Sequence, residues 1–278
     1  MTTSPADDLD YATELARSAA AVALRHYGHV ERLTKTHAAA QHEAVTQADR
    51  DVQAHVVAAL RSRYPSDGVV GEEDDAGRGI TADIPDPAGR VWVIDPIDGT
   101  NNFIAGFGHF AVCIGLLERG MPVLGVVHDV VAGVTYRAAR GCGMWVNGTR
   151  TRCLTTPMGD SSVLMLTSNL LLPDGRLPGF VSRWLSQTNW KVRVIGSAAL
   201  EAALVAAGVA HGAVTINGKL WDVAAAAALV LEAGGCVVGL DGRDVFPFEL
   251  RNYGGAKVPF LACGPAARET LVAEVTRA

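Results

Sequence analysis

The sequence has no run of basic residues and little charge overall. Charged side chains make up 19% of its 278 residues, and 24 Lys and Arg stand against 29 Asp and Glu, which gives a formal net charge of −5. A nucleic-acid interface needs a clustered positive field, so we expect no nucleic-acid partner. Small phosphorylated molecules stay compatible with this charge, because a few cations or bound metals can hold one anion.

Long hydrophobic stretches are also missing. The longest apolar run, residues 223–231, has nine residues, whereas about 20 are needed to cross a bilayer. The first ten residues, MTTSPADDLD, are polar and acidic, and a secretory signal would start with basic residues followed by apolar ones. We therefore expect no membrane association and a cytoplasmic protein.

The five cysteines are odd in number and include no Cys-x-x-Cys pair. This usage favours reduced thiols in a cytosol over a disulfide framework or a zinc site. Aromatic residues are sparse at 6%, but 49% of the chain is hydrophobic and 30 residues are glycine. Such a composition is typical of a globular protein with many turns.

Hydrophobic periodicity in the first half predicts helices packed on a sheet. Apolar residues recur every three or four positions up to Gly28, and again from Thr46 to Tyr64, which predicts two amphipathic helices. The predicted strands are residues 69–70, 91–94, 111–117 and 123–129, with a polar loop at 74–90 and hairpin turns at Arg119-Gly120 and Asn147-Gly148. Residues 1–150 are expected to form an α+β unit with an antiparallel sheet.

The second half alternates between strand and helix patterns. The predicted strands are residues 163–167, 191–195 and 213–216, and the predicted helices are residues 197–207 and 223–233. This alternation is typical of α/β architecture. We expect residues 151–278 to form an α/β half that shares one interface with residues 1–150, since no low-complexity linker separates them.

Three groups of acidic residues lie where predicted strands and helices begin or end: Glu72-Glu73, Asp95 with Asp98, and Asp222. Each group has an ordinary structural explanation. Residues 72–75 fit a solvated acidic loop, Asp98-Gly99 fits a β-turn after the strand, and Asp222 fits a helix N-cap. Alone, none of the three groups indicates a site.

A different interpretation follows if Glu72, Asp95, Asp98 and Asp222 converge. Two like charges 4 Å apart repel by about 4 kcal/mol at an effective dielectric constant of 20, so the cluster must either take up protons or bind cations. Ligand sets made of carboxylate oxygens select hard ions such as Mg²⁺, which commonly bridges to substrate phosphate. No Cys or His lies within these motifs to favour zinc.

The strings GEED, WVIDPIDGTNNF and LWDVAAAAALVLEAGG occur in this order. With them the chain resembles the inositol monophosphatase family of magnesium-dependent, lithium-sensitive phosphatases. The resemblance extends from residues 45–49 to Gly234-Gly235, and it includes the hairpin at residues 141–148 and the segment at residues 196–199. It implies a layered αβαβα sandwich of the inositol monophosphatase and fructose-1,6-bisphosphatase type, and a homodimer.

The resemblance also assigns metal-binding and catalytic roles. It implies two or three Mg²⁺ ions per active site, and their ligands are Glu72, Asp95, the backbone carbonyl of Ile97, Asp98 and Asp222. Asp95 would bridge two ions. Glu73 and Thr100 match the positions that orient and activate a water. Asp49 matches an acidic support for Thr100, although its place on the second helix also fits a surface residue.

Substrate-binding positions are carried over in the same way. The matching residues are Gly99, Thr100, Asn101, Arg193, Gly196, Ser197 and Ala198. From the residues alone, Arg193 also fits a surface arginine, and residues 196–198 fit an N-cap turn. Inositol-selective members carry a glutamate shortly before the Trp-Asp pair, and Thr215 or Ile216 takes its place here.

The resemblance therefore implies a magnesium-dependent phosphomonoesterase of the phosphoric monoester hydrolase class. Its substrate would be a small polyol or sugar phosphate, with inositol 1-phosphate as the family default and direct attack by an activated water as the mechanism. The alternatives within the family are a histidinol-phosphatase, a fructose-1,6-bisphosphatase and a 3′(2′),5′-bisphosphate nucleotidase. An alternative of a different class is a non-catalytic regulator that binds metal and anions.

Overall fold

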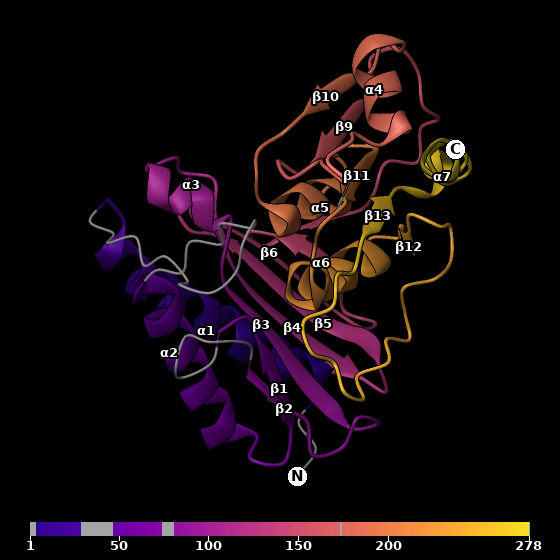
Figure 1. Ribbon diagram of the computed structural model, residues 1–278. Coiled ribbons are helices and arrows are strands. Elements are labelled where there is room, and N and C mark those ends of the chain that lie inside the picture. Colours follow the sequence, from indigo (N-terminus) through magenta and orange to yellow (C-terminus); the bar gives the residue numbers. More distant parts are fainter. Residues whose placement is uncertain (1–3, 29–46, 74–80, 173, 278) are drawn as a thin grey trace.

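The computed structural model describes residues 4–28, 47–73, 81–172 and 174–277, and these form alternating layers of helices and sheets (Figure 1). The strands of the first sheet are β1 (Gly68–Gly71), β2 (Thr81–Asp83), β3 (Arg90–Asp98), β4 (Ala111–Glu118), β5 (Met121–Asp129), β6 (Val134–Ala139), β7 (Gly143–Val146) and β8 (Thr149–Thr151). They lie in the order β2-β1-β3-β4-β5-β6-β7-β8. Only β1 and β3 pair in parallel within this sheet, among the described strands.

The second sheet is smaller and mixed. Its strands are β9 (Val163–Leu166), β10 (Lys191–Arg193), β11 (Gly212–Thr215), β12 (Cys236–Gly239) and β13 (Phe260–Cys263). They lie in the order β10-β9-β11-β13-β12, so that β12 forms one edge. The helices are α1 (Pro5–His26), α2 (Gln47–Arg63), α3 (Thr100–Ala105), α4 (Gly179–Ser186), α5 (Ala198–Ala206), α6 (Leu220–Glu232), α7 (Arg268–Thr276) and the short 3₁₀ turn η1 (Pro265–Ala267).

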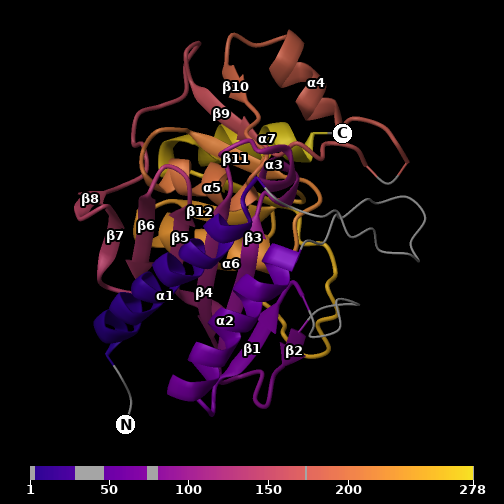
Figure 2. The same ribbon diagram turned by 90° about the vertical axis from the view of Figure 1, so that its left-hand side faces the viewer.

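Helices α1 and α2 cover the outer face of the eight-stranded sheet (Figure 2). Their apolar stripes pack on alternate residues of β3, and Trp92 and Ile94 are fully buried there. The intervening residues Val91 and Val93 face the opposite side and join a second core with α5 and α6. Because side chains alternate between the two faces of a strand, β3 contributes to two hydrophobic layers at once.

Helix α6 lies unusually close to the central strands because both surfaces are made of small residues. A Cβ added to Gly115 of β4 would lie 2.8 Å from the backbone N of Ala225, and one added to Gly125 of β5 would meet the backbone of the same residue. The alanine run of α6 therefore rests directly on β4 and β5. This contact fixes where the first turn of α6, with Asp222, meets the sheet.

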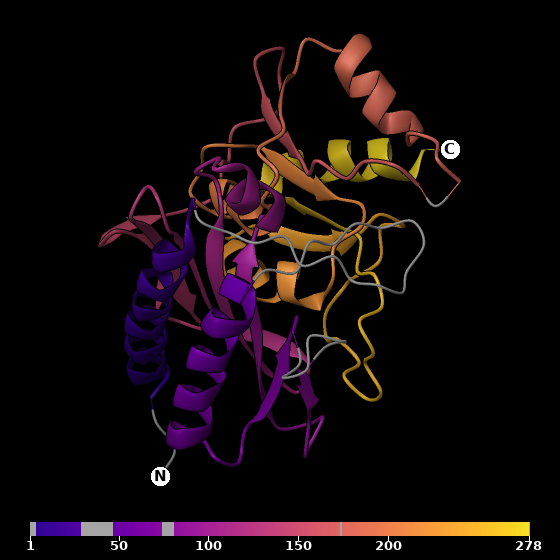
Figure 3. The same ribbon diagram turned by 60° about the vertical axis from the view of Figure 1, so that its left-hand side comes forward.

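Helices α4 and α7 cover the far face of the five-stranded sheet (Figure 1 and Figure 3). Phe180, Trp184 and Leu271 pack there against Leu164 and Val214 of β9 and β11. Five layers result, in the order helix, sheet, helix, sheet, helix. The predicted αβαβα sandwich is confirmed. Among the described residues, no helix combines the length and apolar character that a membrane span requires.

Several local predictions are corrected by the structure. The first sheet is not wholly antiparallel, because β1 and β3 run in parallel, and β2 lies within the expected polar loop. Asp98 is not on a turn: β3 continues to it. Asp222 is not a helix N-cap, because α6 begins at Leu220. Residues 46, 74 and 75, named in the helix and loop predictions, lie outside the described residues.

The division of the chain at residue 150 stays a prediction. The first sheet takes its strands from residues 68–151 and the second from residues 163–263. The core around α5 and α6 contains residues of both sheets.

Candidate active site

Asp95, Asp98 and Asp222 converge at the end of β3. Each offers a carboxylate oxygen, and these oxygens lie within 4.8 Å of one another. Residues three apart on a regular strand would face opposite sides of the sheet. The register of β3 against β4 shifts between Asp95 and Asp98, and this bulge turns both carboxylates toward the same cluster. Pro96, which has no N–H to donate, fits the bulge.

Asp222 reaches the cluster from the third position of α6. The N-cap is Lys219, whose backbone N–H donates to Asp222 Oδ2 at 2.5 Å. From the third helical position, the carboxylate therefore accepts the N–H of the N-cap residue while it remains beside the two aspartates of β3. Its side chain is only partly buried, so the cluster is accessible from this direction.

Asp95 is almost completely buried, and 2% of it is exposed. Burial raises the pKa of Asp95 well above its usual value, and the charges of Glu72, Asp98, Asp222 and Asp49 raise it further. Glu72 and Asp49 are therefore close enough to add to the negative field. Asp49 is buried on α2, which excludes the alternative of a surface residue.

This concentration of negative charge fits a cation site. The donors are carboxylate oxygens, which is the chemistry that hard divalent ions prefer. Cys113 of β4 pairs with Asp95 of β3. Burial together with the nearby Asp98 charge raises the pKa of its thiol well above the usual value. A neutral thiol is a poor ligand, so the cluster does not resemble a zinc site.

Asp98 connects the cluster to the predicted substrate segment. Its Oδ2 accepts a hydrogen bond from the Ser197 hydroxyl and another from the N–H of Ala199 at 2.9 Å, and its Oδ1 accepts from the N–H of Ala198 at 3.2 Å. Burial raises the pKa of Asp98, and these hydrogen bonds oppose the shift. Ser197 and Ala198 thus hold a cluster carboxylate in place, and both are buried.

The turn after β3 brings further predicted residues together. The Ile97 N–H donates to Asp95 Oδ1 at 3.1 Å, and the Thr100 hydroxyl donates to the Ile97 carbonyl at 3.0 Å. Gly99 has φ +95°, a conformation that favours glycine. A Cβ there would lie 3.0 Å from the His109 carbonyl. The backbone of Ile97 therefore links the Asp95 carboxylate, through its N–H, to the Thr100 hydroxyl, through its carbonyl.

A model of the inositol monophosphatase family matches residues 5–277. The chain belongs to this family. It is 33% identical over 247 residues to a fructose-1,6-bisphosphatase/inositol-1-monophosphatase of Thermotoga maritima, covering 89% of this chain and 90% of that protein. It is 39% identical over 206 residues to a histidinol-phosphatase of Mycobacterium tuberculosis, covering 71% and 75%.

A solved structure agrees with these relatives. The Thermotoga maritima IMPase superposes with a TM-score of 0.81 at 30% identity, covering 97% of this chain and 96% of that one. The family consists of metal-dependent phosphatases. This inositol monophosphatase family member is accordingly a phosphoric monoester hydrolase.

Glu72 and Glu73 of this phosphatase are positioned by a residue that no motif revealed. Gln53 lies one helical turn after Asp49 on α2 and is buried. Its Oε1 accepts the Glu73 N–H at 3.0 Å, and its Nε2 donates to the Glu73 carbonyl. A Cβ on Gly71 would lie 2.5 Å from Gln53 Oε1. Glycine at position 71 therefore lets the amide approach the strand end.

Asn102 was also missed, although it lies within the WVIDPIDGTNNF string. Its Nδ2 donates to the carbonyls of His109 and Ile195, both at 2.7 Å. Gly196 follows with φ +82°, and a Cβ there would lie 3.2 Å from the Asn102 amide. Asn102 therefore ties α3 to the segment that leads into α5.

Glu201 is a third missed residue, and it is fully buried on α5. Its Oε1 accepts the N–H groups of Ile195 and Gly196 at 3.0 and 3.1 Å, whereas Oε2 has no hydrogen-bond partner among the described residues. Burial raises the pKa of Glu201 to about 8. In the sequence, Glu201 could have been found as the single acidic residue of an otherwise apolar helix.

Other predicted residues are not part of the group of three aspartates. Arg193 is exposed and donates to the carbonyl of its neighbour Val192 at 3.0 Å, and Asn101 is exposed on α3. Thr215 and Ile216 are buried and offer no carboxylate. The Lys219 ammonium lies 5.2 Å from the centre of the Trp221 ring.

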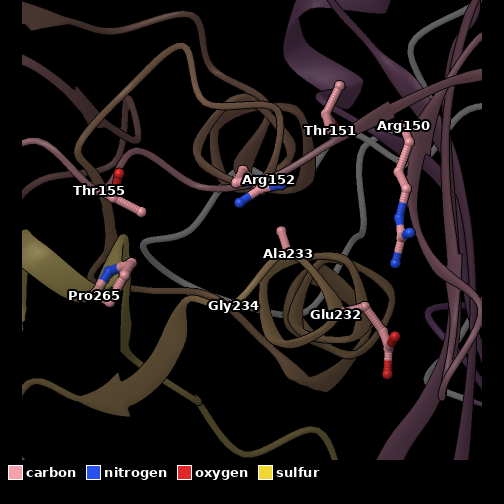
Figure 4. A pocket seen from close by; sticks show the side chains of 8 residues that line it. All are labelled: Arg150, Thr151, Arg152, Thr155, Glu232, Ala233, Gly234 and Pro265. Carbon is pink, nitrogen blue, oxygen red and sulfur yellow. The ribbon is translucent and has the colours of Figure 1, made fainter.

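A separate cavity of about 520 Å³ lies at the other end of α6 (Figure 4). Its lining residues are Arg150, Thr151, Arg152, Thr155, Glu232, Ala233, Gly234 and Pro265. Ten residues of helix separate Glu232 from Asp222, which is roughly 15 Å along the helix axis. The cavity is therefore not part of the acidic site.

Proposed function

We propose that this protein is a magnesium-dependent phosphomonoesterase that hydrolyses a small polyol or sugar phosphate. The convergence of Asp95, Asp98 and Asp222 supports the proposal most directly. The reaction would be an in-line attack of water on phosphorus, with no covalent phosphoenzyme. Inositol 1-phosphate is the default substrate, because the family model and several relatives are named as inositol monophosphatases.

The proposed ligands of two or three Mg²⁺ ions are Glu72, Asp95, the Ile97 carbonyl, Asp98 and Asp222. When bound, Mg²⁺ supplies stabilisation of the charge that develops on phosphoryl and leaving oxygens, and it lowers the pKa of water. The residues themselves hold this cluster rigidly. Ile97 N–H fixes one oxygen of Asp95 and the start of α5 fixes both oxygens of Asp98.

The remaining roles belong to groups beside the cluster. Glu73 would accept the proton of the attacking water, and the Thr100 hydroxyl would orient that water, with Asp49 as its acidic support. We assign phosphate contacts to the backbone at Gly99, Thr100 and Asn101. We propose that the substrate pocket is lined by Arg193, Gly196, Ser197 and Ala198.

Histidinol phosphate is the second candidate substrate. The histidinol-phosphatase of Mycobacterium tuberculosis is 39% identical over the matched region, and the glutamate of inositol-selective members is absent at Thr215 and Ile216. Fructose 1,6-bisphosphate and adenosine 3′,5′-bisphosphate complete the set of alternatives. A non-catalytic regulator is disfavoured, because Glu73 and Thr100 would have no role in a protein that only binds.

The experiment is phosphate release from these four esters, with Mg²⁺ and with a chelator. We expect turnover of one ester that requires Mg²⁺ and that is lost in Asp95→Asn. Asp160→Asn, which changes an exposed carboxylate far from the motifs in sequence, serves as the matched control and keeps full activity. Turnover that continues with the chelator, or full activity in Asp95→Asn, would overturn the proposal.

The cellular setting is part of the same proposal. All five cysteines are free thiols, which supports a reducing compartment such as the cytoplasm. A homodimer and inhibition by lithium follow from the family resemblance. Light scattering and activity measured with added LiCl would test them.

A further inference from the structure

Two thiols face each other across neighbouring strands of the five-stranded sheet. Cys236 is the first residue of β12 and Cys263 is the last residue of β13, and the antiparallel register pairs them directly. Their sulfur atoms lie 3.2 Å apart. The two sulfurs of a disulfide bond are about 2.05 Å apart. The distance between the Cα atoms of directly paired residues on adjacent strands is compatible with such a bond. A small side-chain movement would therefore bring the sulfurs to bonding distance.

The two thiols differ in access and in acidity. Cys263 is buried, whereas Cys236 is partly exposed on the edge strand β12. A hydrogen bond from the Cys263 thiol and the nearby Arg268 guanidinium lower the pKa of Cys236 to about 7, against the opposing effect of burial. The same hydrogen bond and burial raise the pKa of Cys263. Cys236 is thus the thiol that ionises more readily, and the Cys263 thiol in contact with it ionises less readily.

Peroxide would reach the pair through the partly exposed Cys236. Gly234 and Pro265 line the cavity of Figure 4, and each is two residues away from one of the two thiols. The third nearby cysteine, Cys153, is buried, and burial raises its pKa to about 12. Among the described residues these sulfurs do not form a group with metal-ligand spacing. The geometry favours two-sulfur chemistry over a zinc site.

We propose that Cys236 and Cys263 form a reversible cross-strand disulfide when a hydroperoxide, such as hydrogen peroxide, oxidises Cys236. The Cys236 thiolate attacks one peroxide oxygen, the O–O bond breaks, and hydroxide leaves and takes up a proton to become water. Cys236 is then a sulfenic acid. The Cys263 sulfur attacks the Cys236 sulfur, and the thiol proton leaves with the hydroxyl group as a second water. Two thiols lose two electrons and the peroxide gains two.

The disulfide would close the chain between positions 27 residues apart. The enclosed segment includes Tyr253, whose hydroxyl accepts the N–H of Leu220 at the start of α6 at 2.9 Å. Closing this loop restricts the unfolded chain. The oxidised protein is therefore expected to melt at a higher temperature than the reduced protein, and a dithiol reductant is expected to reverse the shift.

The test maps thiols directly and does not depend on phosphatase activity. The reduced full-length chain is treated with hydrogen peroxide, remaining thiols are blocked with N-ethylmaleimide, and digested peptides are analysed by mass spectrometry. We expect the loss of two free thiols per chain and one cross-linked peptide pair that contains Cys236 and Cys263. Accumulation of Cys236 sulfinic acid beside an unmodified Cys263, or linkage to another cysteine, would overturn the proposal.

Variants separate the roles of the two sulfurs. In Cys263→Ala the Cys236 sulfenic acid should persist and be trapped by dimedone, and in Cys236→Ala peroxide should leave Cys263 unmodified. Cys142→Ala is the matched control, because Cys142 is also partly exposed and lies in the turn between β6 and β7. It should form the disulfide as the parent chain does. If Cys263→Ala does not fold, the peptide map of the parent chain decides alone.

Discussion

The side-chain amide of Gln53 forms hydrogen bonds with both the N–H and the carbonyl of Glu73. The two residues are 20 positions apart, and the contact fixes the end of β1 against α2. Asp49 lies on the same face of α2 one turn earlier and adds its charge to the field at Asp95. Helix α2 thus supports the acidic cluster through a neutral amide as well as through a carboxylate.

Gln53→Ala is expected to impair catalysis without removing any proposed ligand. Loss of two buried hydrogen bonds lowers the free energy of unfolding by about 2 kcal/mol, and the segment with Glu72 and Glu73 loses its anchor. We expect kcat to fall about tenfold or more, because misplacement of a catalytic group by a fraction of an ångström has effects of this size. The Mg²⁺ concentration for half-maximal activity should also rise, which titration of activity with MgCl₂ measures.

Gln47→Ala provides the control for this variant. Gln47 is the exposed first residue of the same helix. Its side-chain amide donates to Asp51 Oδ1 and accepts from the Arg50 guanidinium, both near the helix start. Its activity and Mg²⁺ requirement should equal those of the parent chain. If both variants lose activity to the same extent, the effect of Gln53→Ala is a general destabilisation of α2.

Asp95→Asn should have opposite effects on stability with and without metal. Burial and neighbouring carboxylates raise the pKa of Asp95, so the metal-free fold loses stability as the pH rises above the ordinary value of this carboxyl. The amide removes this loss, so near pH 7 in a chelator the variant should melt at a higher temperature. With saturating Mg²⁺ the order should reverse, because a ligand at 100 times its Kd stabilises by about 2.7 kcal/mol. Thermal melts of both proteins in both buffers provide the measurement.

Asn102→Ala is expected to weaken substrate binding more than it slows turnover. The variant breaks two hydrogen bonds, one to the His109 carbonyl and one that joins α3 to the Ile195 carbonyl, so the segment at Gly196 is no longer held beside the cluster. We predict a rise in KM of about tenfold, which corresponds to roughly 1.4 kcal/mol of lost positioning, and a smaller change in kcat. Exposed Asn189 gives the control: Asn189→Ala should leave both constants unchanged. An unchanged KM in Asn102→Ala would show that this contact has no part in binding.

The motifs predicted that Asp95, Asp98 and Asp222 meet, and the periodicity predicted most helices and strands around them. Two features could not be read in this way. The bulge that turns Asp95 and Asp98 to one side depends on how β3 pairs with β4, and this pairing is not local in the sequence. Gln53 is a neutral amide with no motif around it, and only the approach of α2 to Gly71 reveals its role. The position of a helix on a sheet is decided by tertiary packing, and the pattern of residues along the chain does not contain this information.

Glu201 should make the stability of the metal-free protein depend on pH. Its pKa is raised from 4.5 to about 8 by burial, so the folded protein binds the proton more tightly than the unfolded chain. Stability from this group is therefore complete below about pH 4.5, falls as the pH rises, and levels off above about pH 8. Glu201→Gln removes this dependence and should be more stable near pH 7, by roughly 3 kcal/mol at most. Denaturant unfolding in a chelator at several pH values measures the difference.

A second substitution separates this electrostatic effect from positioning. Gln at position 201 keeps an oxygen that can accept the N–H groups of Ile195 and Gly196, whereas Glu201→Ala leaves both without their acceptor. We expect Glu201→Gln to retain the KM of the parent chain and Glu201→Ala to raise it. If the two variants have the same KM, the hydrogen bonds to residues 195 and 196 do not position the substrate segment. If Glu201→Gln keeps the pH dependence of the parent chain, the proton that folding takes up is bound at a different carboxyl.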